Sequence, residues 1–242
     1  MKEELQPGTL YVVSTPIGNL EDVTLRAVRV LGGVDVVAAE DTRTTRILLD
    51  HLGLRTPLVS YHARNEERRS PSLLRRLRAG ERIALVTDAG TPGVSDPAFV
   101  LIRAALEEGL RVVPVPGPSA VLAALVAGGV PFDRFVFEGF LPVKKGRSSK
   151  LARLRSERRT VVLFESPHRI LRTLQDLLRE VGDRPAAVAR ELTKKFEEVE
   201  RGLLSEVLER VRRREPRGEY VIILGGGGRG PLPDGNPGED PP

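Results

Sequence analysis

The chain has 242 residues, of which 40% are hydrophobic and 29% charged, a composition that excludes a mostly disordered or fibrous protein. No apolar run approaches the ~18 residues that cross a bilayer, and the amino-terminal residues lack the basic-then-apolar order of a signal peptide, so we expect a cytoplasmic protein. The 38 basic residues exceed the 33 acidic ones, which indicates either a polyanionic partner or the arginine-rich surface of a protein from a GC-rich genome or a hot habitat.

The first half of the chain alternates short β-branched runs with amphipathic helical stretches, the pattern of a parallel sheet covered by helices. We therefore predict one doubly wound α/β domain. The expected strands are residues 10–13, 34–38, 56–60, 83–87 and 112–115, and the expected helices are 23–32, 43–52, 70–79 and 97–108.

A further helix beginning near Ser119 should end at the two glycines and the proline of residues 128–131, which we interpret as an interdomain hinge. The fold class is thus α/β with two α/β domains, residues 1–128 and 129–225, and a Gly/Pro-rich tail, 226–242, that we expect to be disordered. The second domain should contain strands 135–138, 160–164, 186–189 and 220–224, and the charged run 196–201 could add an antiparallel strand.

Two loops on the expected first sheet have the composition of ligand-binding loops. Residues 88–97 follow one strand and hold two glycines, two prolines and two aspartates, which is more than a tight turn requires. Residues 116–120 follow the next strand and contain two prolines before Ser119; taken alone, they could equally be a stiff connector. Because both loops follow parallel strands, they should meet at one edge of the sheet.

Other strand ends carry weaker signals. The segment 14–20 lacks the glycine spacing of a dinucleotide-binding fold and of a P-loop, so neither NAD nor ATP is supported. Glu40 and Asp41 could belong to a site or to a helix cap. Segments 164–170 and 190–197 place ionisable groups at strand ends of the second domain, although His168 alone is more often a solvated helix-start residue.

Residues 144–159 contain eight basic side chains and one acidic side chain, and Leu151 and Leu154 have helical spacing. This predicts an amphipathic basic helix that could bind phosphates. With aromatic residues at 4% of the chain and no tryptophan, we expect any RNA binding to depend on phosphate contacts rather than base stacking. Residues 64–82 are also basic, but their mixed charges are typical of a solvated helix face.

Seven motifs, in order along residues 8–224, resemble the family of ribosomal RNA small subunit methyltransferase I, a branch of the tetrapyrrole methylases (class III methyltransferases). The resemblance implies methylation of a cytidine ribose 2'-hydroxyl in 16S rRNA near the decoding centre, with S-adenosyl-L-methionine (AdoMet) as the methyl donor. It also implies a homodimer, with the cofactor in a cleft between the two domains. The motifs are residues 10–20, 40–43, 88–92, 116–120, 138–142, 165–169 and 190–194.

The resemblance further implies which residues carry the activity, with no metal and no membrane involved. A base or proton relay is expected among Glu165, His168, Glu191 and Lys194, and sequence alone does not rank them. The expected AdoMet contacts are Pro16, Ala89, Gly90, Thr91, Val94, Ser119, Ala120, Phe164 and Glu165. The expected RNA contacts are Lys144, Lys145, Arg147, Lys150, Arg153, Arg169 and Arg190.

Three other interpretations are open on the residues alone. Asp88 loosely resembles the nucleophile of an aspartate-based phosphatase, but Gly90 occupies the position where that chemistry needs a second carboxylate. A methylase of the same fold could act on a tetrapyrrole, although the basic segment 144–159 favours RNA. A non-enzymatic RNA-binding protein would explain the basic segment but not the paired strand-end loops.

The sequence contains no cysteine, which excludes disulfides, thiolate nucleophiles and cysteine-ligated zinc. Its three histidines, His51, His62 and His168, are widely scattered and show no metal-ligand spacing.

Overall fold

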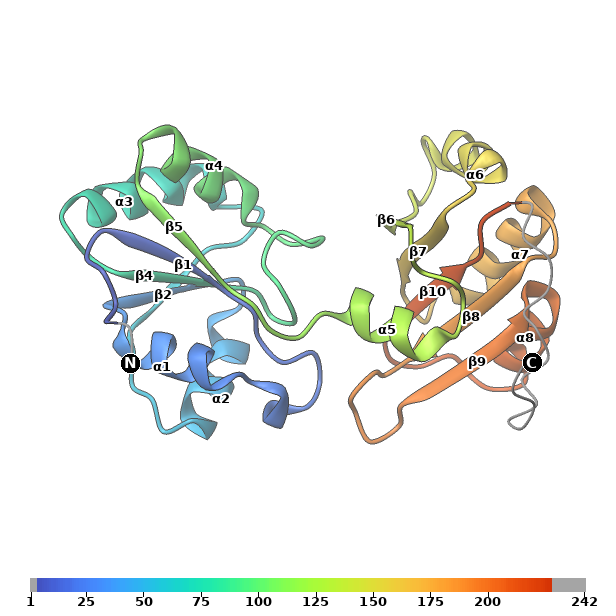
Figure 1. Ribbon diagram of the computed structural model, residues 1–242, viewed down its shortest axis with the longest axis horizontal. Coiled ribbons are helices and arrows are strands. Elements are labelled where there is room, and N and C mark those ends of the chain that lie inside the picture. Colours follow the sequence, from blue (N-terminus) through green and yellow to red (C-terminus); the bar gives the residue numbers. More distant parts are fainter. Residues whose placement is uncertain (1–3, 228–242) are drawn as a thin grey trace, which may run out of the picture. The chain divides into compact units, whose positions relative to one another are not determined.

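The structure is a computed structural model that describes residues 4–227. The chain divides into two compact units between Ser119 and Ala120. Each unit is built on one five-stranded sheet with helices packed against it (Figure 1). The predicted fold class, two α/β domains in sequence, is therefore confirmed.

The first unit has a fully parallel sheet with the strand order β3-β2-β4-β1-β5. All five predicted strands are present, with ends that differ by a few residues. Because the strands are parallel, the loops that follow them all lie at the same edge of this sheet. The strands are β1 (Thr9–Val13), β2 (Val36–Ala39), β3 (Leu58–Ser60), β4 (Ile83–Val86) and β5 (Arg111–Val115).

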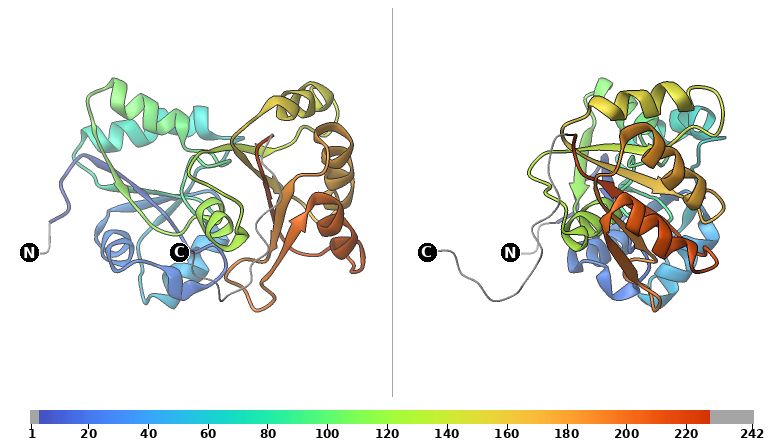
Figure 2. Two further views of the ribbon diagram at one scale, coloured as in Figure 1. Left: turned by 45° about the vertical axis from the view of Figure 1, so that its right-hand side comes forward. Right: turned by 90° about the vertical axis from the view of Figure 1, so that its right-hand side faces the viewer.

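Helices cover both faces of this sheet, as a doubly wound fold requires (Figure 2). Alternate residues of β1 point to opposite faces: Val13 packs with the helices α1 and α2, whereas Leu10 packs with α3 and α4. The helices are α1 (Leu25–Gly33), α2 (Thr42–His51), α3 (Glu66–Arg78) and α4 (Phe99–Glu107), and a short 3-10 helix, η1 (Leu20–Asp22), precedes them.

Helix α3 begins four residues before the predicted start at residue 70. Pro71 lies in the second turn of the helix. The Ser70 hydroxyl donates to the Glu66 carbonyl at 2.7 Å, one turn before the proline. The helix thus tolerates Pro71 close to its start, where few intrahelical hydrogen bonds are lost.

The second unit has a mixed sheet with the strand order β6-β7-β10-β8-β9. Strand β6 pairs in parallel with β7, while β10 and β9 are antiparallel to their neighbours. The predicted antiparallel strand at 196–201 is thus confirmed as β9, shifted by two residues. The strands are β6 (Phe135–Phe140), β7 (Thr160–Glu165), β8 (Pro185–Arg190), β9 (Glu198–Leu203) and β10 (Tyr220–Leu224).

Three helices bury their apolar stripes against one face of the second sheet: α6 (Arg147–Ser156), α7 (Ile170–Val181) and α8 (Leu204–Arg212). Helix α5 (Ala120–Gly128) packs against the other face, and a Cβ added at Gly128 would lie 3.4 Å from the side chains of Ala187 and Ile223. Because α5 contacts this sheet, it belongs to the second unit. The division of the chain thus lies before α5, nine residues earlier than the hinge that we predicted after residue 128.

Of the predicted tail 226–242, only Gly226 and Gly227 are among the described residues, so the expectation of disorder concerns a segment outside them. Within residues 4–227 no helix is long and apolar enough to cross a membrane.

Candidate active site

Three loops at the carboxyl edge of the first sheet are tied together by hydrogen bonds. Thr15, after β1, and Gly90, after β4, form an antiparallel bridge in which each amide donates to the other's carbonyl, at 2.9 and 3.1 Å. The Ser14 and Thr91 hydroxyls lie 2.8 Å apart, and Thr91 donates to the Pro118 carbonyl at 3.4 Å. The structure therefore brings together the two glycine- and proline-rich loops that we predicted to meet.

Gly90 allows this close approach through its backbone conformation. It is buried with a φ of +85°, and a Cβ there would be at ordinary contact distance, 3.5 Å, from Ile17. The requirement for glycine thus comes from the positive φ and not from lack of space. Ser95 also has a positive φ, 73°, which is uncommon outside glycine and is often found at functional loops.

A cavity of about 110 Å³ lies at the same edge, lined in part by Pro16, Thr87 and Asp88. Complete pockets for small molecules usually measure ~300–1,000 Å³, so this cavity could hold only part of a cofactor. Among the predicted AdoMet residues of this unit, Pro16, Gly90 and Thr91 therefore lie close together at one edge of the sheet.

Three carboxylates accompany these loops. The Glu40 carboxylate accepts hydrogen bonds from the Thr87 hydroxyl at 2.6 Å and from the Asp88 amide at 3.3 Å, and Asp88 accepts from the Asp41 amide at 3.0 Å. Burial, followed by repulsion from Glu40, raises the pKa of Asp96 to about 6. The loop edge of the first unit is therefore strongly acidic, a property that the sequence analysis did not identify as part of the site.

The strand register of the second unit places the predicted catalytic segments at one edge of the sheet, on either side of β10. Tyr220, at the start of β10, pairs with Glu165 at the end of β7 and with Arg190 at the end of β8. Glu191 and Lys194 follow Arg190 directly. The antiparallel course of β10 thus brings the segments 165–169 and 190–194 to one edge of the sheet.

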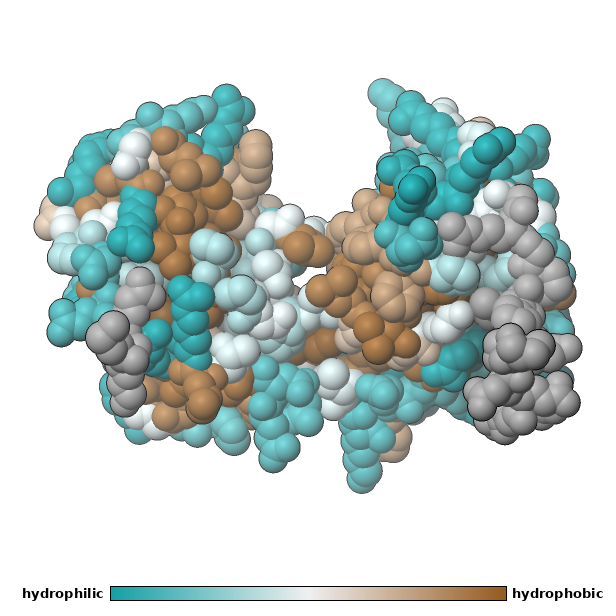
Figure 3. Space-filling model, in the orientation of Figure 1, coloured by the Kyte–Doolittle hydropathy of each residue, from teal (hydrophilic) through white to brown (hydrophobic). Residues whose placement is uncertain are grey.

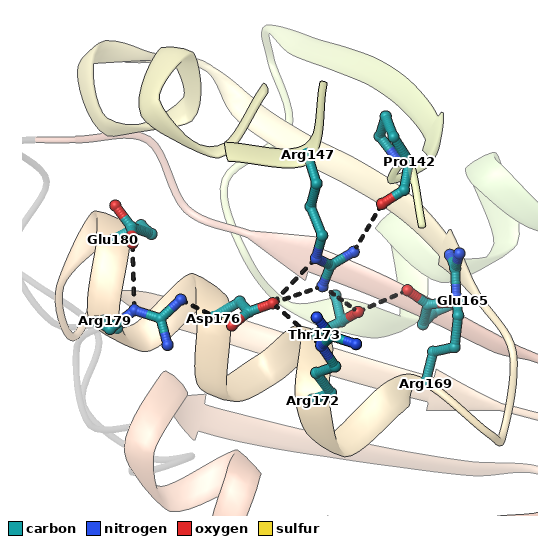
Figure 4. Close-up of polar contacts among 9 residues, drawn as sticks. All are labelled: Pro142, Arg147, Glu165, Arg169, Arg172, Thr173, Asp176, Arg179 and Glu180. Atoms are coloured by element: carbon teal, nitrogen blue, oxygen red, sulfur yellow. Dashed lines mark hydrogen bonds and ion pairs between the residues drawn. The ribbon is translucent and has the colours of Figure 1, made fainter. Parts of the chain in front are cut away.

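Glu165 is buried and fully engaged in polar contacts (Figure 4). Its carboxylate accepts from the Ser166 amide at 2.8 Å, from Arg169 Nε at 2.7 Å and from the Thr173 hydroxyl at 2.7 Å. These three donors fix the carboxylate within its own unit. Glu165 therefore orients Arg169 and the first turn of α7.

Thr173 extends the contacts to the basic helix α6. Its hydroxyl accepts from Arg147 Nη2 at 2.9 Å, and Arg147 Nε donates to Asp176 at 3.0 Å. Arg147 is 7% exposed, which places its guanidinium between α6 and α7 (Figure 4). The structure thus removes Arg147 from the predicted RNA contacts and gives it a structural role.

The pKa of Asp176 reflects this environment. Burial raises the pKa, but the hydrogen bonds from Arg147 and Arg179 outweigh burial, and the pKa stays below its usual range. Asp176 is consequently ionised at neutral pH, as the partner of a buried arginine must be.

Lys194 lies between two carboxylates, with its Nζ 2.9 Å from both Glu191 and Glu219. Burial lowers the pKa of Lys194, but the hydrogen bonds to Glu219 and Glu191 outweigh it and the pKa is raised. Burial likewise raises the pKa of Glu191, but hydrogen bonds from Lys194 and from the Glu219 amide bring the net pKa down. Both groups are therefore charged at neutral pH, which suits Lys194 for orienting an anion and not for accepting a proton.

The backbone around Glu191 and Lys194 is strained. Glu191 and Thr193 have φ values of 49° and 67°, a region that costs a residue with a side chain ~1–2 kcal/mol.

His168, the fourth predicted catalytic residue, is exposed. Its side chain has no hydrogen-bonding partner within residues 4–227. Of the four candidates it is thus the one whose side chain makes no hydrogen bond within the described residues.

The remaining predicted RNA contacts divide into two groups. Lys144, Lys145 and Arg153 are exposed and lack an ion-pair partner in the described part of the chain. Lys150 is paired with Glu138, Arg169 with Glu165, and Arg190 lies 3.7 Å from Glu198. Arg169 Nη2 and Arg190 Nε are nonetheless buried without a hydrogen-bond partner in residues 4–227, so each retains an unused donor.

Sequence reasoning missed four polar residues that complete these sites: Asp96, Thr173, Asp176 and Glu219. A signal was available for Arg147, because it lies four residues before Leu151 and seven before Leu154, on the apolar face of α6. No comparable signal identifies Asp176, which lies on a different helix, 29 residues further along the chain.

Known proteins resemble this chain over most of its length. The sequence profile of the Tetrapyrrole (Corrin/Porphyrin) Methylases matches residues 9–208. The "Ribosomal RNA small subunit methyltransferase I" of Synechocystis is 49% identical over 90% of this chain and 79% of its own length. The protein of the same name from Thermotoga maritima is 45% identical over 90% of this chain and 99% of its own length.

Solved structures show the same fold at lower sequence identity. The methyltransferase CobJ superposes with a TM-score of 0.67 at 23% identity, covering 91% of this chain and 95% of its own. The uroporphyrin-III C-methyl transferase of Thermus thermophilus, solved with S-adenyl homocysteine, gives a TM-score of 0.63 at 24% identity, covering 90% of this chain and 97% of its own.

Proposed function

Because the chain belongs to the tetrapyrrole methylases and, within them, to the ribosomal RNA small subunit methyltransferase I proteins, we propose that it methylates 16S rRNA with AdoMet as the methyl donor. The observation that carries this proposal is the high identity to rRNA methyltransferases across nearly the whole chain. The proposed acceptor is the ribose 2'-hydroxyl of a cytidine near the decoding centre, in the cytoplasm.

The first unit has features that fit AdoMet, a ligand with a sulfonium and an ammonium group. The acidic loop edge around Glu40, Asp88 and Asp96 favours such a cation. Gly90, with its positive φ, and Thr91 provide a close approach to the backbone, and Pro16 lines the adjoining cavity. Ala89, Val94 and Ser119 lie on the same loops. Ala120, the first residue of α5, and Phe164 and Glu165 are the proposed contacts from the second unit.

When bound, AdoMet supplies an electrophilic methyl group, and the protein must align the ribose hydroxyl with it and remove the hydroxyl proton. His168 is the proposed proton acceptor, because its side chain has no competing contact within residues 4–227. Lys194, held as a cation by Glu191 and Glu219, orients the phosphate beside the acceptor ribose.

The lack of cysteine argues against cytosine C5 as the acceptor. Methylation of cytosine C5 proceeds through a covalent adduct with a cysteine nucleophile, and this chain has none. A ribose hydroxyl needs only orientation and proton removal, which His168 and Lys194 can provide.

The proposed RNA contacts are the unpaired side chains of Lys144, Lys145 and Arg153, together with Lys150, Arg169 and Arg190. Phosphate contacts release condensed counterions, so affinity should fall steeply as salt concentration rises. Replacing Lys144, Lys145 and Arg153 by alanine should weaken RNA binding and flatten its salt dependence while AdoMet affinity is retained. Unchanged RNA affinity in this variant would contradict the assignment.

A homodimer is the proposed assembly. Large apolar side chains are exposed on the second unit, including Val126 at 73% and Phe140 at 54%, and Figure 3 shows apolar surface gathered there. Patches of this kind often mark protein–protein interfaces. Analytical ultracentrifugation should show a dimer that Val126→Asp weakens; a wild-type monomer at all concentrations would contradict it. The large exposed apolar residues of the second unit are Leu122, Val126, Phe132, Phe135, Phe140, Val143 and Phe196.

The proposed reaction is tested by methylating unmodified 30S subunits and free 16S rRNA with labelled AdoMet and digesting the RNA to nucleosides. The label should appear on the ribose of a cytidine. His168→Ala, Glu191→Ala and Lys194→Ala should lose activity while binding AdoMet normally. Label on a base, or incorporation only into a tetrapyrrole, would refute the proposed substrate.

A further inference from the structure

A second basic surface lies at the carboxyl-terminal end of α6, away from the residues assigned so far. It is a concavity of about 900 Å³ lined by five arginines, Arg134, Arg155, Arg158, Arg159 and Arg184. These arginines come from the segment before β6, from α6 and the turn that follows it, and from the turn before β8. We call this surface the arginine concavity. All of its lining residues belong to the second unit.

Arg184 lies at the base of the concavity and is 9% exposed. Its guanidinium donates to carbonyls at the ends of two helices: Nε to Val181 at 3.0 Å, Nη1 to Leu154 at 3.3 Å and Nη2 to Arg155 at 2.5 Å. The negative ends of the helix dipoles stabilise a cation there. Since these acceptors are all uncharged carbonyls, the positive charge of Arg184 remains uncompensated by a carboxylate.

Two of the other arginines are partly neutralised. Arg159 forms an ion pair with Glu157 at 2.8 Å, and Arg155 lies 3.8 Å from Glu180. Arg134 and Arg158 are exposed, and neither has an ion-pair partner in the part of the chain that the structure describes. The concavity therefore holds a clear excess of positive charge, and placing like charges together is unfavourable unless an anion neutralises them.

We propose that the arginine concavity binds the phosphodiester backbone of the rRNA substrate, with Arg134 and Arg158 making the phosphate contacts. This proposal rests on the proposed function and adds a binding site to it. Arginine suits phosphate because its planar guanidinium can donate two parallel hydrogen bonds. The arginines of the concavity could contact successive phosphates of one RNA strand.

The position of the concavity relates it to the surface already proposed. Lys144 and Lys145 precede the first residue of α6, whereas Arg155 and Arg158 lie at and beyond its other end. A helix of 10 residues is about 15 Å long. An RNA strand that follows α6 would thus contact lysines at one end and the arginine concavity at the other.

The test compares two variants that each remove two positive charges. Arg134→Ala/Arg158→Ala removes the unpaired arginines of the concavity. Arg75→Ala/Arg213→Ala is the matched control, because these arginines are also exposed and unpaired within residues 4–227 but lie on α3 and at the end of α8. For each variant we would measure the binding of 16S rRNA by filter binding across a salt series and the kinetics of methylation. Calorimetry would give the affinities for AdoMet and for pyrophosphate.

Counterion release predicts the size of the effect. Each lost phosphate contact on single-stranded RNA reduces the slope of log K against log salt by ~0.7, so losing two should weaken binding roughly 25-fold at 0.1 M salt. We expect this loss of affinity, and a higher KM for rRNA, in the concavity variant only, with unchanged AdoMet affinity. Thermal unfolding of both variants checks that they remain folded.

Several outcomes would overturn the proposal. RNA affinity and salt slope equal to those of the control would exclude an RNA contact at the concavity. Pyrophosphate binding lost in the concavity variant while RNA binding is unchanged would identify a site for free polyphosphates instead. If the wild-type protein methylates no 16S rRNA, the proposed function fails, and the binding series still decides by itself whether the concavity contacts RNA.

Discussion

Replacing Arg147 by alanine should destabilise the protein, although the sequence alone suggested a surface RNA contact. The change removes hydrogen bonds to Asp176 at 3.0 Å, to Thr173 at 2.9 Å and to the Pro142 carbonyl at 3.3 Å. Removing one member of a buried ion pair typically costs ~3–5 kcal/mol, because the other charge is left without a partner. Asp176 keeps Arg179 at 2.8 Å, so we expect the free energy of unfolding to fall by ~2–3 kcal/mol.

The assay is urea unfolding followed by far-UV circular dichroism, supported by thermal melts. For a chain of this size, ~1 kcal/mol corresponds to ~2–4 °C, so the melting temperature should fall by ~5–10 °C. Arg153→Ala is the control, since Arg153 lies on the same helix but is exposed, and its change should stay within ~0.5 kcal/mol. Equal stability of the two variants, or a higher KM for rRNA in Arg147→Ala without loss of stability, would refute a structural role for Arg147.

Three further predictions concern the loops and the proposed base. Gly90→Val should weaken AdoMet binding at least tenfold, because a β-branched residue is strained at a φ of +85°; calorimetry showing a change of twofold or less would contradict this. The folded-state pKa of Asp96 is raised from 3.8 to about 6, so the folded protein holds the Asp96 proton more tightly than the unfolded chain does. The contribution of protonated Asp96 to the free energy of unfolding is therefore complete below pH ~4 and is lost as the pH rises through ~6. Asp96→Asn should therefore be more stable than wild type by ~1–2 kcal/mol at pH 7.5, a value discounted for partial exposure, with the difference disappearing near pH 4; a difference that does not vary with pH in urea unfolding would disprove it. His168→Ala should lower kcat ~100-fold or more with AdoMet and RNA affinity retained; near-normal single-turnover rates would exclude His168 as the base.

The acidic edge of the first unit and the basic surfaces of the second have opposite charge for a physical reason. AdoMet carries positive charge, whereas RNA carries one negative charge per nucleotide, so one protein that binds both needs separate surfaces of opposite sign. In the proposed assignment Glu40 and Asp88 provide the first, and Lys144, Lys145 and the arginine concavity provide the second. The salt series proposed for RNA should thus leave AdoMet affinity much less affected.

The elements of this fold were largely predictable from local sequence. Alternating β-branched runs and amphipathic stretches determine where strands and helices form, because burial of one helix face or of whole parallel strands requires those patterns. Glycines and prolines after strands β4 and β5 indicated the proposed ligand loops for a similar reason, since a positive φ at residues such as Gly90 is a local property of the backbone.

Contacts between distant segments were decided only by the tertiary structure. The register of β10 places Tyr220 between Glu165 and Arg190, and nothing in either segment specifies that arrangement. Arg147 looks like any other cation of the basic segment until α7 places Asp176 3.0 Å away. Likewise, Arg134 and Arg184 are 50 residues apart and share the arginine concavity only because β6, α6 and β8 pack together. A side chain's charge is local, but whether that charge meets a partner, a ligand or water depends on packing that the one-dimensional pattern does not contain.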